Sequence, residues 1–110
     1  MFHRLTRMKP IDRNNCPIAR AGEIIGDRWS LLLLREFFLE GTRRFSDLQE
    51  VLDLSPNTLS GRLKKLEQAG VIERRFYSRH PPRAEYGLTE RGRSLGPVMD
   101  ALYDWGSGQA

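Results

Sequence analysis

The sequence has few of the residues on which enzymes and metal proteins depend. Its 110 residues include one cysteine, Cys16, and two histidines, His3 and His80. A zinc site needs ligands at paired spacings, and a catalytic His needs a Ser or Cys partner within reach. The sequence has neither arrangement, and it has no phosphate-binding loop. We therefore predict a protein that is not an enzyme and that holds no metal and no cofactor.

Long apolar runs are also missing. The longest, Leu31 to Leu34, is far shorter than the roughly 20 residues that a membrane-spanning helix requires. The start of the chain, MFHRLTRMKP, is basic but lacks the apolar stretch and the cleavage site of a secretory signal. A single cysteine cannot form an internal disulfide, which fits a reducing compartment. These features predict a cytoplasmic protein that makes no membrane contact.

Acidic residues are scarce in one part of the chain. The net charge is +4, and residues 54–83 alone hold seven cations against two acids. Positive charge gathered in this way is typical of nucleic-acid binding, although a solvated cationic surface would have the same composition. The length of 110 residues and the hydrophobic content of 39% indicate a single small globular domain.

The first part of the chain differs from the rest. Residues 1–15 show no clean hydrophobic period and hold four cations against one acid, so we predict a basic N-terminal arm. A folded domain then covers residues 16–110. Its first helix begins at Cys16 and Pro17, because Pro suits the first helical position, and Gly26 ends it.

A second helix is predicted from about Arg28 to Glu40. Asp27 is its N-cap, and Gly41 follows its end. Apolar side chains cover most of its circumference. A helix of this kind lies at the centre of a fold or is shared with another subunit.

A short third helix follows. Ser46 and Gln49 have the spacing of a capping box, and Phe45 is predicted to lie just before it in an extended piece. The residues expected to face inward are Leu48, Val51 and Leu52.

A fourth helix has the clearest start in the chain. Ser55 is its N-cap, Pro56 occupies the first helical position, and Leu54 can pack across the cap against Leu59. Gly70 ends it. The inward stripe consists of Leu59, Leu63 and Leu66, and the outward side carries Asn57, Ser60, Gly61, Lys64, Lys65 and Gln68. Because only a short turn separates this helix from the third, the two form a helix-turn-helix.

The pattern changes after the fourth helix. Residues 71–77 favour a strand, residues 78–83 cannot continue one, and residues 84–88 resume it. These segments predict a β-hairpin with a basic, proline-stiffened tip. Thr89 then caps a last helix. Its apolar stripe consists of Leu95, Val98, Met99, Leu102 and Trp105.

The predicted fold class is mainly α with a small β-hairpin (α+β), in the order of a winged helix-turn-helix. The major groove of DNA is about 12 Å wide and admits a helix whose outward side chains are small and polar. With Ser55 at the helix start, the residues assigned to bases are Asn57, Thr58, Ser60 and Arg62. The residues assigned to phosphates are Lys64, Lys65, Arg74 and Arg75. The residues assigned to the minor groove or its flanking backbone are Arg79, His80 and Arg83.

A different function class would share much of this pattern. An amphipathic fourth helix that faces solvent would suit a winged domain that binds other proteins. A protein-interaction module without sequence-specific DNA binding is therefore the alternative to a DNA-binding regulator.

Four stretches of the sequence combine into a recognisable whole. They are CPIARAGEIIGDRWSLLLLREFF, RFSDLQEVL, LSPNTLSGRLKKLEQAGVIERRFY and PPRAEYGLTERGRSLGPVMDALYDW. From Cys16 to Trp105 the chain resembles the HxlR-type winged-helix transcription regulators, which are MarR-like. The family pattern usually has Gly-Lys where this chain has Asp27 and Arg28. The resemblance implies a bacterial or archaeal dimer that binds an operator, with dimer contacts from the first and last helices.

The residues themselves also indicate a homodimer. The stripe on the last helix and the nearly all-apolar second helix exceed what one small core can cover, and an exposed patch of this kind marks an interface. The alternative is that the last helix folds back as part of the core.

Cys16 is a candidate redox sensor. At a helix N-cap near Arg13 and Arg20 it lies in a positive environment that favours a thiolate. The resemblance implies the same role, since some similar regulators sense oxidants or quinones through a cysteine at this place. The alternative is that Cys16 is structural, chosen for packing and capping. A small-molecule or oxidant effector is the corresponding partner.

Overall fold

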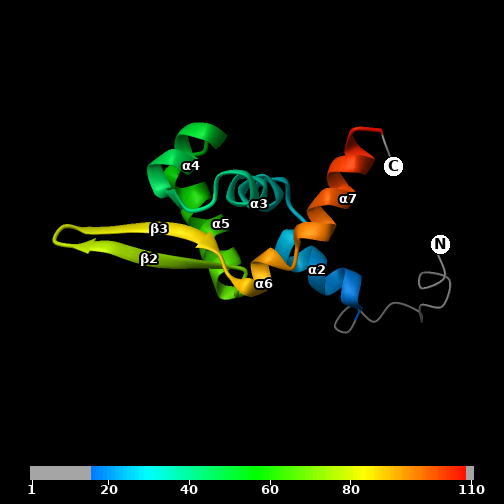
Figure 1. The fold of residues 1–110 in the computed structure, drawn as a ribbon, viewed down its shortest axis with the longest axis horizontal. Coiled ribbons are helices and arrows are strands. Elements are labelled where there is room, and N and C mark those ends of the chain that lie inside the picture. Colours follow the sequence, from blue (N-terminus) through cyan, green and yellow to red (C-terminus); the bar gives the residue numbers. More distant parts are fainter. Residues whose placement is uncertain (1–15, 109–110) are drawn as a thin grey trace.

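The computed structural model describes residues 16–108, and the basic arm predicted for residues 1–15 lies outside this part of the chain. The elements are α2 (Pro17–Ile25), α3 (Arg28–Glu40), β1 (Arg43–Arg44), α4 (Phe45–Leu52), α5 (Pro56–Gln68), β2 (Ile72–Arg79), β3 (Pro82–Leu88), α6 (Glu90–Arg93) and α7 (Gly96–Gly106). The fold is mainly helical with a small antiparallel sheet, and its order is that of a winged helix-turn-helix, as predicted (Figure 1). None of the helices in the described part is long and apolar enough to cross a membrane.

Three helices begin where the sequence places their caps, namely α2, α3 and α5. The Oδ1 atom of Asp27 accepts a hydrogen bond from the backbone N–H of Ser30 at 2.9 Å. The Oγ atom of Ser55 accepts one from the N–H of Thr58 at 3.2 Å, whereas Cys16 makes no such bond. A capping side chain stabilises a helix by about 1 kcal/mol, so α3 and α5 have better-fixed starts than α2.

Helix α4 begins earlier than predicted. The predicted capping box of Ser46 and Gln49, with Phe45 extended, is wrong, because Phe45 is the first helical residue. The Oδ2 atom of Asp47 accepts a hydrogen bond from the backbone N–H of Arg44 at 3.2 Å. A carboxylate three residues into the helix fixes the start at Arg44, where the short strand β1 ends.

The hairpin is longer than predicted. Residues 78–83 were expected to break both strands, yet β2 continues to Arg79 and β3 begins at Pro82. Only His80 and Pro81 form the turn. Proline is compatible with the first position of a strand, where its missing N–H interrupts little of the hydrogen-bond ladder. The sheet order is β1-β3-β2, and the basic tip projects far from the helices (Figure 1).

The predicted last helix is divided in two. Thr89 caps a helix as predicted, because its Oγ1 atom accepts a hydrogen bond from the N–H of Gly92 at 3.0 Å. This cap belongs to the short helix α6, and a turn at Ser94 and Leu95 separates α6 from α7. Pro97 has no N–H to donate to the preceding turn, so one regular helix cannot pass through this position.

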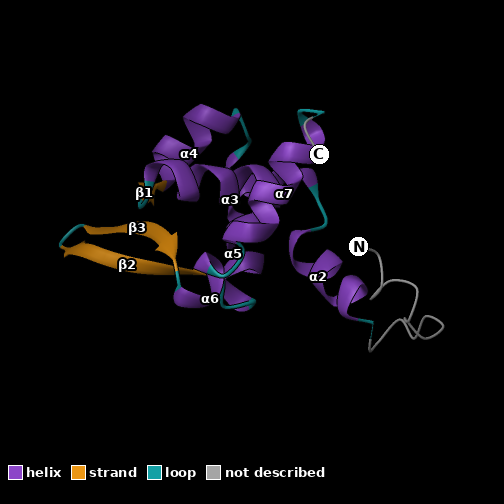
Figure 2. Cartoon of the chain, turned by 45° about the vertical axis from the view of Figure 1, so that its right-hand side comes forward, coloured by secondary structure: helices purple, strands orange, loops and turns teal. Residues whose placement is uncertain are grey.

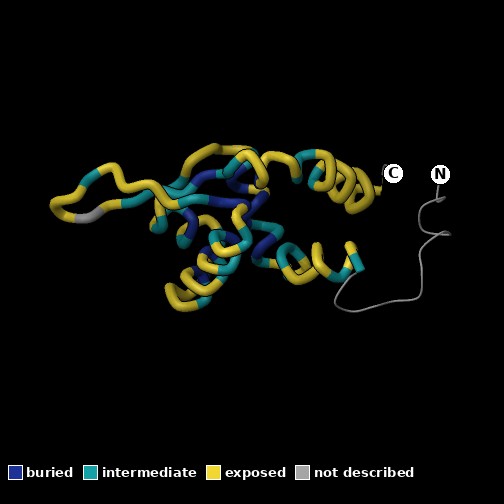
Figure 3. Tube along the Cα trace, turned by 90° about the horizontal axis from the view of Figure 1, so that it is seen from below, coloured by how far each residue is buried: buried dark blue, intermediate teal, exposed yellow. Residues whose placement is uncertain are grey.

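The core lies where α3, α4, α5 and the start of β2 meet. Its buried apolar residues are Leu33, Leu34, Phe37, Leu48, Leu54, Leu59, Leu63, Leu66, Val71 and Ile72. Leu54 and Leu59, predicted to pack across the start of α5, both belong to it. Val51, predicted to face inward, is exposed instead. Figure 3 shows this buried centre between an exposed hairpin tip and an exposed α7.

Two groups of elements lie at opposite ends of the molecule. The hairpin projects at one end, and α2 and α7 lie at the other (Figure 1). In the turned view the hairpin and α2 are still at opposite ends (Figure 2). The surface around the hairpin and α5 is therefore separate from the surface around α7, and each can meet a different partner.

Candidate nucleic-acid interface

Helix α5 has two contrasting sides. Its leucine stripe is buried in the core. The exposed residues of the helix and its cap include Ser55, Asn57, Ser60, Gly61, Lys64 and Gln68. Thr58, Arg62 and Lys65 are partly buried at the border between the two sides. The exposed side of α5 therefore carries small polar groups with few bulky side chains.

Gly61 lies in the middle of this exposed side. Apart from its chain neighbours and the nearby backbone of α5 itself, a Cβ atom there would meet no described atom within 4 Å, so internal packing does not require glycine. In the middle of a helix, glycine is destabilising by about 0.5–1 kcal/mol relative to alanine. The close approach of another molecule is a physical reason to have glycine at this position.

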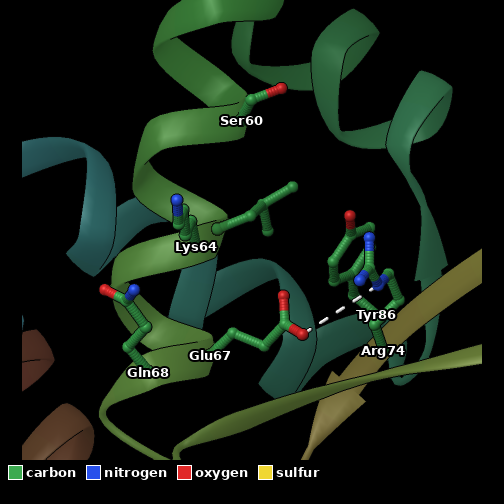
Figure 4. Close-up of a pocket in the computed structure, with 7 residues that line it drawn as sticks. Ser60, Lys64, Glu67, Gln68, Arg74 and Tyr86 are labelled. Atoms are coloured by element: carbon green, nitrogen blue, oxygen red, sulfur yellow. Dashed lines mark ion pairs between the residues drawn. The ribbon is translucent and has the colours of Figure 1, made fainter.

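A hollow of about 490 Å³ with both polar and apolar lining lies between α5 and the sheet. Figure 4 draws the residues that line it: Ser60, Leu63, Lys64, Glu67, Gln68, Arg74 and Tyr86. The Nε atom of Arg74 lies 3.9 Å from the Oε2 atom of Glu67. Because Lys64 adds a second cation, the hollow has two positive groups and one negative group, and an anion such as a phosphate suits it.

Arg74 and Arg75, which the sequence assigns together to phosphates, lie on opposite faces of β2. Arg74 lines the hollow next to Tyr86 (Figure 4). Successive side chains of a strand alternate between its faces, so Arg75 points the other way. There its Nε atom donates a hydrogen bond to the Oε1 atom of Glu73 at 2.7 Å. Only Arg74 shares a surface with α5.

The three predicted contact residues of the hairpin tip come together. Arg79, His80 and Arg83 are all exposed. Arg79 ends β2, and Arg83 follows directly after the first residue of β3. The hairpin thus has a basic end, and this end projects away from α5 (Figure 1).

Asp27, predicted only as a helix cap, also contacts α5. Its Oδ2 atom lies 2.9 Å from the Nζ atom of Lys65, and its Oδ1 atom lies 3.5 Å from the Nε atom of Arg62. Burial opposes ionisation of the carboxyl, but hydrogen bonds from Lys65 and Ser30 and the charge of Lys65 outweigh it and lower the pKa of Asp27 to about 2. Nothing local in the sequence signals this contact, which spans 38 positions.

Arg44 is a further basic residue that the sequence analysis does not single out. Its Cζ atom lies 4.9 Å from the centre of the Tyr77 ring, a cation–π distance, and it is exposed beside the hairpin. The sequence signal that could have identified it is the pair of adjacent arginines, Arg43 and Arg44. Only Arg44 is exposed, because Arg43 lies near Glu36.

Residues 24–110 match the sequence model of the HxlR-like helix-turn-helix family. The chain belongs to this family. An HTH-type transcriptional regulator of Synechocystis, sll1512, is 44% identical over 93 residues, which are 84% of this chain and 68% of that protein. The regulator Rv3095 of Mycobacterium tuberculosis is 46% identical over 89 residues, which are 81% of this chain and 56% of that protein. The chain thus spans little more than half the length of the mycobacterial relative.

Solved structures of regulators have the same fold. The redox regulator HypR in its oxidised form is 30% identical, with a TM-score of 0.77 over 86% of this chain and 98% of that one. The reduced form of the transcriptional regulator YodB from B. subtilis is 33% identical, with a TM-score of 0.71 over 82% of this chain and 89% of that one. This HxlR-family chain is thus a helix-turn-helix protein of the transcription-regulator class.

In this member of the HxlR family, Cys16 is a free, partly buried cysteine at the start of α2. Helix α2, which Cys16 precedes, lies at the opposite end of the molecule from the hairpin (Figure 1). The structure therefore does not place this thiol among the residues assigned to DNA.

Helix α7 presents apolar side chains to solvent. None of its residues is buried, and Tyr103 and Trp105 are 72% and 77% exposed. Between α3 and α7 lies a hollow of about 640 Å³. Its apolar lining includes Leu31, Leu32, Phe38, Leu39, Met99 and Leu102. Helix α7 is thus attached to the core mainly through its first turn, where Leu95 and Met99 pack against buried residues.

Proposed function

We propose that this protein is a cytoplasmic, homodimeric transcription regulator that binds a specific operator in double-stranded DNA. The exposed side of α5 carries the proposal. Small polar side chains surround Gly61, which internal packing does not require, and a cationic hollow adjoins them. Membership of the HxlR-like helix-turn-helix family supports the same conclusion.

In this proposal α5 enters the major groove. The residues that read base edges are Asn57, Thr58, Ser60 and Arg62. Asn can pair with adenine through two hydrogen bonds, and Arg can pair with guanine in the same way. The N-terminus of α5 at Ser55 points backbone N–H groups towards a phosphate.

The DNA backbone contacts come from the hollow and the hairpin. Lys64 and Arg74 bind phosphates beside α5, and Arg44 extends this positive surface past the hairpin. The residues of the tip, Arg79, His80 and Arg83, bind the minor groove or its flanking phosphates. Arg75, which faces the other way, contributes through its charge.

Helices α2 and α7 form the dimer contacts. The apolar side chains that α7 exposes, Tyr103 and Trp105 above all, would be covered by a second copy. Two-fold symmetry then places the two α5 helices about 34 Å apart, on half-sites one turn of DNA apart.

Cys16 is a candidate site for an oxidant or electrophile effector in this dimer. Its position at the start of α2 would couple a change at the thiol to the dimer contacts. The structural similarity to HypR, which is named a redox regulator, supports this role. A purely structural Cys16 that fills space at the helix start is the competing explanation.

Gel shift of the protein with genomic DNA fragments at two salt concentrations tests the function. We expect a subset of fragments to be retained and retention to weaken steeply with salt, because each neutralised phosphate releases counterions. Arg62→Ala should reduce the difference in affinity between the retained fragments and random-sequence DNA. Retention of no fragment at either salt concentration would favour the alternative of a protein-interaction winged helix.

A further inference from the structure

The carboxylate of Asp27 forms ion pairs with two cations of α5. Asp27 lies at the N-terminus of α3, and Lys65 and Arg62 reach it from neighbouring turns of α5 at 2.9 and 3.5 Å. Asp27 also accepts hydrogen bonds from the backbone N–H and the hydroxyl of Ser30, at 2.9 and 2.7 Å. Its carboxylate is thus held in one place by α3 itself, independently of α5.

This contact divides the cations of α5 into two kinds. Lys64 is exposed and has no ion-pair partner among residues 16–108. The side chain of Lys65 is only 35% exposed, and its charge lies next to a carboxylate. The Nε atom of Arg62 is buried 3.5 Å from Asp27 without a hydrogen-bond partner in the described part of the chain, and 38% of its side chain remains exposed. Lys64 is therefore available to bind a DNA phosphate, whereas Lys65 is already paired with a carboxylate.

We propose that Asp27 is a specificity-determining residue, which withholds the charge of Lys65 from phosphates by holding it in an ion pair. This inference rests on the proposed DNA-binding function. It changes the role that the sequence assigns to Lys65, from phosphate contact to internal partner.

The physical reason is that phosphate contacts strengthen binding to every sequence alike. A Lys65 bound to Asp27 adds little to that sequence-independent attraction. The ratio of the affinity for the operator to the affinity for random-sequence DNA is therefore higher with the Asp27 carboxylate than without it.

The decisive measurement is the salt dependence of binding to a short random-sequence duplex, followed by fluorescence anisotropy. Each phosphate-bound cation contributes about 0.9 to the slope of log Kobs against log salt. In the parent protein, Lys65→Met should leave this slope within about 0.3 of its original value. Lys64→Met, the matched control one residue away, should reduce it by about 0.9.

A second test removes the carboxylate that binds Lys65, through the variant Asp27→Ser. Serine is also a good N-cap, so this change removes the charge and keeps a capping hydroxyl. If Lys65 is released to bind a phosphate, we expect the slope to steepen by about 0.9. Raising the salt from 50 to 200 mM should then weaken binding by a further factor of roughly 3.5 relative to the parent. Lys65→Met in this background should remove that gain, whereas Lys64→Met should have the same effect as in the parent.

The outcomes separate the two proposals. A loss of about 0.9 in slope for Lys65→Met in the parent means that Lys65 already binds phosphate, which overturns the role of Asp27 and leaves DNA binding intact. If circular dichroism shows that Asp27→Ser does not fold, the comparison of Lys65→Met with Lys64→Met in the parent protein still decides whether Lys65 binds phosphate. A parent protein that binds no duplex at low salt overturns the proposed function, and the inference with it.

Discussion

The hydroxyl of Thr89 donates a hydrogen bond to the backbone carbonyl oxygen of Gly70 at 2.6 Å. Gly70 follows the end of α5, and Thr89 caps α6. The bond therefore joins the exit of α5 to the segment that leads to α7. The same hydroxyl oxygen accepts a hydrogen bond from the N–H of Gly92, and a Cβ at Gly92 would collide with the carbonyl oxygen of Val71.

Thr89→Val should destabilise the protein. Valine has nearly the same shape but neither donates to Gly70 nor accepts from Gly92. We expect the free energy of unfolding to fall by about 1–2 kcal/mol, the range for a lost cap and a lost hydrogen bond. Urea unfolding followed by circular dichroism measures it, with Thr89→Ser as the control that keeps the hydroxyl. Equal stability of the Val and Ser variants would rule out this link.

Gly61→Ala should change stability and DNA binding in opposite directions. The added methyl group meets no described atom beyond its chain neighbours and the nearby backbone of α5, so the free energy of unfolding should rise by about 0.5–1 kcal/mol. Binding to DNA fragments selected by the parent should weaken, because the methyl group stands where the groove approaches. Thermal unfolding and anisotropy titration measure the two effects. Unchanged affinity would show that the DNA stays away from this part of α5.

Acid should remove the contribution of Asp27 to stability. The pKa of its carboxyl is lowered from 3.8 to about 2 in the folded protein. A lowered pKa stabilises the fold above the unfolded value, so this contribution is complete above about pH 4 and is lost between about pH 4 and pH 2. With solvent screening it should amount to about 1 kcal/mol.

Urea unfolding of the parent and of Asp27→Ser at pH 7 and near pH 2 measures this contribution. The stability difference between the two proteins should shrink as the pH falls. A difference that stays constant over this interval would mean that the carboxyl has an ordinary pKa.

Trp105→Glu should dissociate the proposed dimer without unfolding the monomer. The side chain is 77% exposed, so a charge there costs the fold little, but it would be buried against a second copy. Sedimentation velocity at micromolar concentration should shift from dimer to monomer. Phe76→Glu is the control, because Phe76 is an exposed aromatic residue on the hairpin, away from α7. A parent protein that is already monomeric would contradict the proposal.

Cys16→Ser tests the proposed sensing role. If the thiol is the sensor, hypochlorite or a quinone should release DNA from the parent protein and leave the variant bound. Anisotropy before and after treatment, with a reductant added back, measures the response. Release of DNA to the same extent by both proteins would leave Cys16 as a structural residue.

The sequence alone determined the helix-turn-helix and the ends of most helices. The start of α5 depends on Ser55 and Pro56, and its end on Gly70, which has a φ of 76°. Such signals act within about four residues of the feature that they set, so they can be read without knowing the fold. The same locality explains the misplaced start of α4: the spacing of Ser46 and Gln49 predicts a cap at Ser46, whereas Asp47 accepts the hydrogen bond that fixes the cap at Arg44.

Only the tertiary structure decided which charges share a surface. Arg74 and Arg75 are adjacent in sequence and separated by the sheet, whereas Asp27 and Lys65 are 38 positions apart and in contact. The sequence shows that α5 is basic, but the charge it presents depends on how α3 packs against it. Electrostatic interactions follow distance in space, and that distance is set by the packing of whole elements.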